Sequence, residues 1–143
     1  MNQITHAAAN WWAEQLKPGE DNHDVGDAMG NLLSNMMSTT AKAPSDEAVE
    51  VFRQSLERQL TERYDNFLDR FGVELFGSIA VSVDYGPGMF LCQALEEANI
   101  RDIGSMLLPF KTHMRITANK VEVSKGYRAP YVTVIEIEKD EVK

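Results

Sequence analysis

The chain has 143 residues, 43% of them hydrophobic and 25% charged, a size and composition typical of one globular domain with its own core. Its net charge of −8 argues against nucleic-acid binding over the whole surface, because such binding draws most of its energy from phosphate neutralisation. No apolar run approaches the ~20 residues that a membrane span needs, and residues 1–15 lack the basic and apolar regions of a secretory signal.

Cysteine and histidine content favours a cytoplasmic protein without a metal or cofactor. Cys92 is the only cysteine, so no internal disulfide can form and a reducing compartment is the default. The histidines His6, His23 and His113 lack the spacing of metal ligands. Cys92 lies near the start of a predicted helix, which could stabilise a thiolate, but no His–acid pair accompanies it and a structural thiol is favoured.

The first 72 residues favour three helices. Apolar residues recur at helical spacing from Ile4 to Leu16 and again from Val25 to Met37. A third, long helix is expected at 45–71, because Ser45 is a good N-cap and acidic residues follow it in the first turn.

After residue 72 the apolar period changes from helical to two, which predicts strands. The expected order is a strand from Ile79 to Tyr85, a short helix at 89–99, a loop, a hairpin of Thr112–Ile116 with Val121–Ser124, and a last strand at Tyr131–Ile137.

The fold class that follows is α+β: three N-terminal helices and then βαβββ, with a four-stranded mixed or antiparallel sheet and the helices on one face. We expect a single domain over 1–143, with a helical part at 1–72, a sheet-forming part at 73–138 and a frayed tail at 139–143.

Positive charge is concentrated in one part of this acidic chain. Residues 101–131 hold six basic residues against two acidic ones, whereas residues 1–100 hold six basic against sixteen acidic. Such a cationic window on an anionic body indicates a place where an anion docks. The alternative is a solvated sheet face whose lysines keep edge strands from aggregating.

Strand spacing places Lys111, His113 and Arg115 on one face of the hairpin, with Thr112 on the other. The candidate ligand-binding residues are Lys111, Thr112, Arg115, Lys125, Tyr127, Arg128 and Asp84. Tyr127 and Arg128 lie in a Gly/Pro-rich turn, where a ring can stack on a base while a guanidinium binds phosphate.

The turn Asp84-Tyr85-Gly86-Pro87-Gly88 precedes a helix and could present free N–H groups to an anion, although it matches neither a Walker A loop nor a dinucleotide fingerprint. A simple turn is the favoured interpretation. Asp84 could contact a ligand or act as a base, but a salt bridge to Lys111 or Arg115 is favoured.

Trp11 and Trp12 suggest a second surface. Neighbours on a helix differ in direction by about 100°, so the two rings are not expected to face one core together. One of them is expected to reach a subunit contact, where tryptophan is favoured, and we therefore expect a homo-oligomer.

Several short motifs resemble those of a family of small uncharacterised phage and prophage proteins. They are Trp11-Trp12-Ala13, Val83-Asp84-Tyr85-Gly86-Pro87, Pro109-Phe110-Lys111-Thr112-His113-Met114 and Gly126-Tyr127-Arg128-Ala129-Pro130. The resemblance implies a phage setting, in which small accessory proteins often counter host defence.

These observations lead to the hypothesis of a phage-encoded anti-defence protein, not an enzyme, that sequesters an anionic, nucleotide-type signal in the host cytoplasm. In it Lys111, Arg115, Lys125 and Arg128 bind phosphates, Tyr127 stacks on a base, and Thr112 and Asp84 hydrogen-bond ribose or base edges. Neither a membrane nor a nucleic acid is an expected partner.

The alternative hypothesis is an acidic protein–protein inhibitor. Its negatively charged first hundred residues would imitate a nucleic acid and occupy the groove of a host immune complex, as a CRISPR inhibitor might. A nucleotide hydrolase is a third possibility, disfavoured because the sequence offers no nucleophile–base pair and no metal cluster.

Overall fold

The computed structural model describes residues 2–17, 44–126, 128–138 and 140. Within them the chain forms α1 (Gln3–Glu14), α3 (Asp46–Phe71), β1 (Ile79–Val83), α4 (Met89–Glu97), α5 (Arg101–Leu107), β2 (Thr112–Ile116), β3 (Lys120–Lys125) and β4 (Tyr131–Glu136). The predicted α+β class is confirmed. No helix in this part of the chain combines the length and apolar character needed to cross a membrane.

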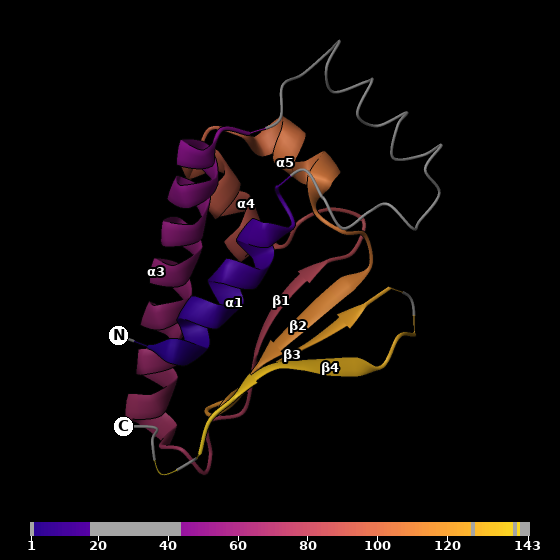
Figure 1. Cartoon of the computed structure of the whole chain (residues 1–143). Coiled ribbons are helices and arrows are strands. Elements are labelled where there is room, and N and C mark those ends of the chain that lie inside the picture. The colour runs from indigo at the N-terminus through magenta and orange to yellow at the C-terminus, as the bar shows by residue number, and fades with distance from the viewer. Residues whose placement is uncertain (1, 18–43, 127, 139, 141–143) are drawn as a thin grey trace.

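The four strands form one sheet in the order β1-β2-β3-β4, and every neighbouring pair is antiparallel (Figure 1). The sequence predicted either a mixed or an antiparallel sheet, and the structure has the antiparallel one. Although α4 and α5 lie between β1 and β2 in the chain, the two strands pair directly, so no parallel crossover is needed.

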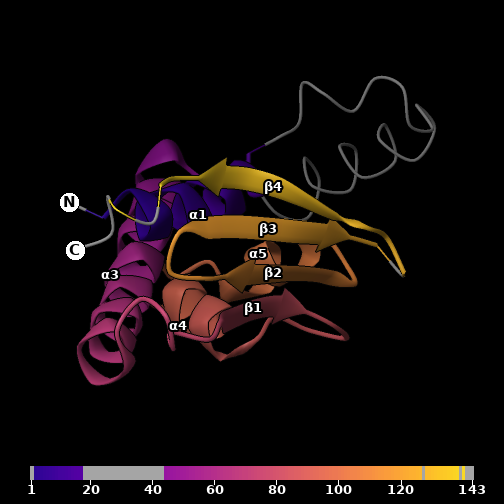
Figure 2. The ribbon, with the colours of Figure 1, turned by 90° about the horizontal axis from the view of Figure 1, so that it is seen from below.

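Helices cover one face of the sheet (Figure 2). Helix α1 contacts β2, β3 and β4, helix α4 contacts β1, and α3 packs against both α1 and α4. The core between these layers contains the fully buried side chains of Trp12, Phe52, Leu56, Ile116 and Val121. Among the described residues no helix covers the opposite face, where strand side chains alternate toward solvent.

Side chains cap the N-termini of α1 and α3, and the sequence predicted the second of these caps. The Asn2 side chain accepts hydrogen bonds from the N–H groups of Ile4 and Thr5, and Ser45 accepts one from Ala48. These oxygens satisfy N–H groups that have no partner inside the helix. The start of the long helix at Ser45 is therefore confirmed.

Two expectations about the helices change. The predicted helix from Val25 to Met37 lies outside the described residues. Residues 101–107, predicted as a loop, form α5, so the sheet-forming part is βααβββ. The helix escapes a periodicity analysis because of its seven residues only Gly104 is buried, and this glycine lies against Leu95 of α4.

Trp11 and Trp12 are also placed differently from the expectation. Trp12 is fully buried, and Trp11 is partly buried against the same core, with the two rings in an edge-to-face contact at 4.9 Å between centroids. The two rings can share one core because Trp11 packs edge-to-face against Trp12 instead of pointing away from it.

Candidate functional site

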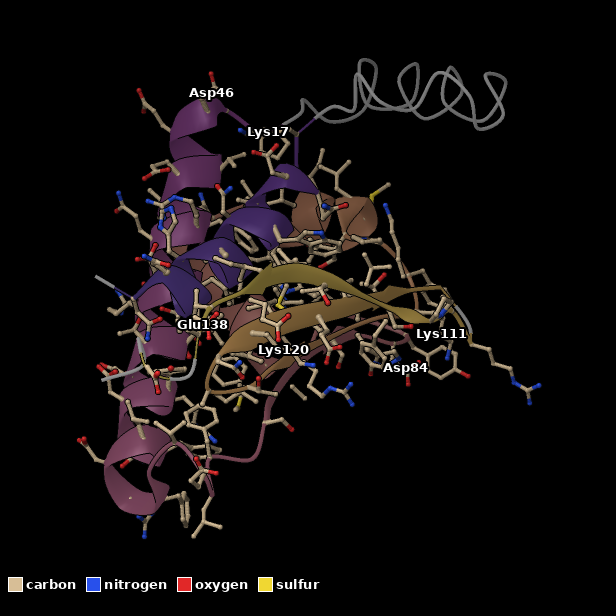
Figure 3. The ribbon with its side chains drawn as sticks, turned by 60° about the horizontal axis from the view of Figure 1, so that its bottom comes forward. Lys17, Asp46, Asp84, Lys111, Lys120 and Glu138 are labelled. Atoms are coloured by element: carbon tan, nitrogen blue, oxygen red, sulfur yellow. The ribbon has the colours of Figure 1, made fainter. Side chains whose placement is uncertain are left out.

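Loops meet at the end of the sheet where β1 and β3 finish and β2 and β4 begin. The register places Val83, the last residue of β1, opposite Thr112, the first residue of β2. Thr112 in turn lies opposite Lys125, the last residue of β3. The loops at 84–88 and 108–111 therefore lie beside each other, next to the described residues of the β3–β4 turn. We call this region the loop end, and Figure 3 shows Asp84 and Lys111 together there.

The 84–88 loop folds back tightly on its own strand. The Asp84 N–H donates to the Gly86 carbonyl at 3.2 Å, and the Gly88 N–H donates to the Ser82 carbonyl at 2.9 Å. A Cβ at position 88 would lie 3.0 Å from the Ser82 oxygen, so the close return favours glycine. The Gly88 N–H is thus already bonded within the turn, which is consistent with the favoured interpretation of the sequence.

The 108–111 loop is held by its backbone. Lys111 adopts a left-handed conformation with φ of 57°, which is uncommon for a residue other than glycine. Its carbonyl accepts a hydrogen bond from the Gly126 N–H at 3.1 Å, and the Phe110 carbonyl accepts one from the Thr112 hydroxyl at 3.4 Å. These bonds fix the direction in which Phe110 and Lys111 leave the sheet.

The Lys111 ammonium group joins the two loops. Its Nζ lies 2.5 Å from Oδ1 of Asp84, 4.1 Å from the centroid of the Tyr85 ring and 5.6 Å from that of Phe110. The hydrogen bond to Asp84 raises the pKa of Lys111, so the group stays charged. Asp84, Tyr85, Phe110 and Lys111 form what we call the aromatic–lysine cluster.

The aromatic rings of this cluster face solvent. Tyr85 is 84% exposed and Phe110 is 58% exposed, and their rings meet in a T-shaped contact with centroids 6.1 Å apart. Aromatic side chains left in water at a protein surface commonly mark a site where another molecule binds. Here they come from two loops and are held in place by one lysine.

The structure brings together only part of the predicted ligand site. Asp84 and Lys111 meet in an ion pair, which confirms the favoured interpretation of Asp84 as a salt-bridge partner. Lys111 itself precedes β2 and is not on the strand face with His113 and Arg115. The reason is its left-handed backbone, which interrupts the strand alternation.

Thr112 and Lys125 do not fit the predicted roles. Thr112 is fully buried, so its hydroxyl cannot reach a ligand on the surface. Lys125 lies opposite Thr112 in the β2–β3 ladder, and residues opposite one another share a face of the sheet. Lys125 therefore lies on the helix side at the exposed end of β3, away from the face that carries Arg115.

Arg115 is already engaged on the open face of the sheet. Its Nη2 lies 2.9 Å from Oε1 of Glu122, and its guanidinium stacks over Tyr131 at 4.4 Å from the ring centroid. The hydrogen bond from Arg115 lowers the pKa of Glu122. Arg128 is exposed in the β3–β4 turn with φ of 59°, and Tyr127 lies outside the described residues.

Sequence reasoning missed Tyr85 and Phe110 as site residues. The alternation Ile79, Val81, Val83 suggests that Tyr85 continues an inward strand face, but β1 ends at Val83 and the chain turns outward. Phe110 was visible only as an aromatic residue after Pro109. An aromatic residue immediately before Gly-Pro-Gly was the available signal, because a tight turn carries its neighbours to the surface.

Two grooves elsewhere on the described surface contain arginines that already have partners. One of about 390 Å³ lies between α1 and α3, where Arg53 pairs with Glu50 and Glu57, each at 2.6 Å. Another of about 340 Å³ lies between α3 and α4, where Arg63 contacts the Phe90 ring. No group of three or more His, Cys, Asp or Glu side chains in the described residues is placed to hold a metal ion.

Comparison with known proteins identifies the fold. No protein-family model matches the sequence, and no curated protein matches it either. Among solved structures, the chain is similar to a doubly substituted form of the BTG/Tob domain of C. elegans FOG-3, with a TM-score of 0.63 and 12% sequence identity. The match covers 98% of this chain and 85% of the other, so nearly the whole chain shares the fold of a BTG/Tob domain.

This finding overturns the functional hypothesis drawn from the sequence. The shared fold is that of an animal BTG/Tob domain, and it gives no support to a phage anti-defence protein that binds a nucleotide or imitates a nucleic acid. The geometry explains the error: the cationic residues lie on different faces, Thr112 is buried, and Lys111 and Arg115 pair with carboxylates of the chain itself. The resemblance of short motifs to phage proteins stays a prediction.

Proposed function

We propose that the protein is a binding module that acts without catalysis and recognises a segment of a partner protein through the loop end. The observation that carries this proposal is the exposure of Tyr85 and Phe110, two large aromatic side chains that meet at the tips of two adjacent loops. Their position on loops held by a packed sheet is the usual arrangement of a recognition surface.

The free energy available from these rings supports a role in binding. Fully burying a phenylalanine side chain contributes roughly 1.5–3 kcal/mol relative to leaving it exposed. Tyrosine is among the residues that most often dominate protein–protein interfaces, because its ring is large and its hydroxyl can still bond at the rim. A partner that covers Tyr85 and Phe110 would therefore gain most of its affinity at this cluster.

The arrangement of the cluster lowers the cost of binding. Ordering a mobile side chain at an interface costs about 0.5–1.5 kcal/mol. Lys111 already contacts both rings and is itself held by Asp84, so less freedom remains to be lost when a partner arrives. The ammonium group also presents a charge beside an apolar surface, a combination that selects among partners.

Charge at the loop end favours an acidic partner segment. Lys111, Lys125 and Arg128 carry three positive charges there against one negative charge on Asp84, while the chain as a whole is −8. An acidic segment with an apolar or aromatic residue would be attracted to the loop end and repelled by the rest of the surface. We expect such a segment to bind in extended form across the two rings.

Selection from a displayed library of random peptides tests the proposal without a known partner. Peptides retained by the wild-type chain should be rich in acidic and apolar residues. Their binding should weaken about tenfold or more in Tyr85→Ser and Phe110→Ser, the loss expected when a central aromatic contact is removed.

Leu75→Ser provides the matched control, because Leu75 is also a large exposed apolar residue but lies between α3 and β1. This variant should bind the selected peptides as the wild-type chain does. The proposal fails if no peptide family is enriched, or if the enriched peptides bind Tyr85→Ser and Phe110→Ser with unchanged affinity.

A further inference from the structure

Within the described part of the chain, strand β4 forms an unprotected edge of the sheet. Among the described residues it pairs with β3 alone, and Tyr131, Val132, Thr133 and Val134 are all exposed. No lysine or proline lies within the strand to discourage pairing with another chain. Such an edge offers unpaired backbone N–H and C=O groups along with apolar side chains.

Apolar side chains are exposed on both faces of β4. Tyr131 lies opposite Ser124 on the open face and is 44% exposed, whereas Val132 lies opposite Val123 on the helix side and is 67% exposed. A valine on the helix side of a sheet is normally buried, so its exposure means that the described helices leave this part of β4 uncovered. A further strand paired with β4 would extend the sheet and add neighbours for the side chains on both of its faces.

The other edge of the sheet is finished in a different way. In β1 the three apolar residues Ile79, Val81 and Val83 are buried, and α4 packs beside the strand. A bridge between Val83 and Pro87 closes the end of that edge. The exposed apolar surface is thus a property of β4 and not of edge strands in this sheet generally.

We propose that β4 pairs with β4 of a second copy of this chain, antiparallel, and joins the two sheets into one. The charge pattern supports a second copy as the partner, because it is self-complementary: basic Lys125 and Arg128 precede the strand, whereas residues 136–143 hold four acidic residues against Lys139 and Lys143. A two-fold antiparallel pair places the basic end of one strand beside the acidic end of the other, whereas a parallel pair would place like charges together.

An irregularity in β4 restricts the register of the pair. Val121 lies opposite Ile135 and Glu122 opposite Thr133, so Val134 is an extra residue that forms a bulge. Regular pairing with a second copy is therefore expected to centre on the part of the strand before the bulge. The two-fold axis is expected to pass at Val132 or Thr133.

Val132→Lys tests this interface. A lysine at the centre of the pair would face its symmetry mate or lie close to it, so the dissociation constant of the dimer should rise about tenfold or more. Sedimentation across a concentration series measures the change. Val51→Lys, which replaces another exposed valine on α3, should leave the association unchanged. A chain that is monomeric at every concentration, or a dimer that survives in Val132→Lys, overturns the proposal.

Cysteine cross-linking locates the axis. In a Cys92→Ser background, Val132→Cys or Thr133→Cys should form a disulfide-linked dimer under mild oxidation, because a residue on the axis lies opposite its own copy at a distance a disulfide can span. Ala80→Cys, exposed on β1 at the other edge, should remain monomeric. Equal cross-linking of all three variants, or none in the first two, contradicts pairing through β4.

Discussion

At the residue scale, the backbone conformation of Lys111 determines where its side chain lies at the loop end. Its left-handed backbone, bonded through the carbonyl to Gly126, aims the side chain back across the 84–88 loop. There the ammonium group meets Asp84 and the Tyr85 ring at once. These contacts help to offset the cost of the left-handed backbone.

Glu50 on α3 provides a prediction about pH. Hydrogen bonds from Arg53 first, and from Gln54, lower its pKa from 4.5 to about 2. Because the pKa is lower in the folded state, the pair contributes stability that is fully present above pH 4.5 and is lost as the pH falls toward about 2. Glu50→Gln should therefore unfold at a lower temperature than the wild-type chain above pH 4.5, and the two unfolding temperatures should converge as the pH falls from 4.5 toward about 2.

Asp69→Asn is the control for this measurement. Asp69 is exposed on the same helix and has no ion-pair partner among the described residues. Its replacement should shift the unfolding temperature little at any pH. A gap between Glu50→Gln and wild type that stays constant down to the lowest pH would refute the assigned role of the carboxylate.

At the scale of elements, α5 depends on a glycine contact. A Cβ at Gly104 would lie 2.2 Å from Cδ2 of Leu95, which is fully buried, so the leucine side chain would have to shift within the core. Gly104→Ala should lower the free energy of unfolding by about 1–3 kcal/mol, as overpacking of a filled core does. Denaturant unfolding measures the loss.

A double substitution separates this clash from a general effect of the alanine. Leu95→Ala alone should cost about 2–5 kcal/mol because it leaves a cavity. In the double variant the new methyl group occupies part of that cavity, so the combined loss should be smaller than the sum of the two single losses. Additive losses would show that the Gly104–Leu95 contact is not the cause.

The sequence predicts those elements whose signals are local. Ser45 caps the long helix, alternation marks the strands, and the hairpin of β2 and β3 lies where the pattern indicates. The short helix α5 could not be predicted, since its place depends on Leu95 of another helix and not on its own periodicity. Tertiary contacts decide such elements.

The candidate site was predictable only in part, for a similar reason. The charge window pointed to Lys111 and the turn before the helix pointed to Asp84, and these two residues do meet. It could not show that Lys111 leaves the strand, and it gave no weight to Tyr85 or Phe110, whose exposure results from the end of β1 and a turn. Arg115 belongs to the charge window but is bonded to Glu122 across the ladder, a pairing that only the register reveals.

At the scale of the whole molecule, the loop end and the β4 edge are adjacent but distinct surfaces. Strand β4 begins at the loop end, so antiparallel pairing through β4 would place the two loop ends at opposite ends of the joined sheet. Both recognition surfaces would then face away from each other and stay accessible. Such a dimer could hold two partner segments at once and gain avidity without new contacts.

The central claim is that Tyr85 marks the surface that binds a partner protein. Photo-cross-linking tests it most directly, with a photoreactive phenylalanine analogue at position 85 and, as the control, at the similarly exposed position 75, in the cells that carry the gene. The expected result is one discrete cross-linked product at position 85, absent at 75 and lost when Phe110 is replaced by serine. No discrete product at 85, or the same product at both positions, would contradict the claim.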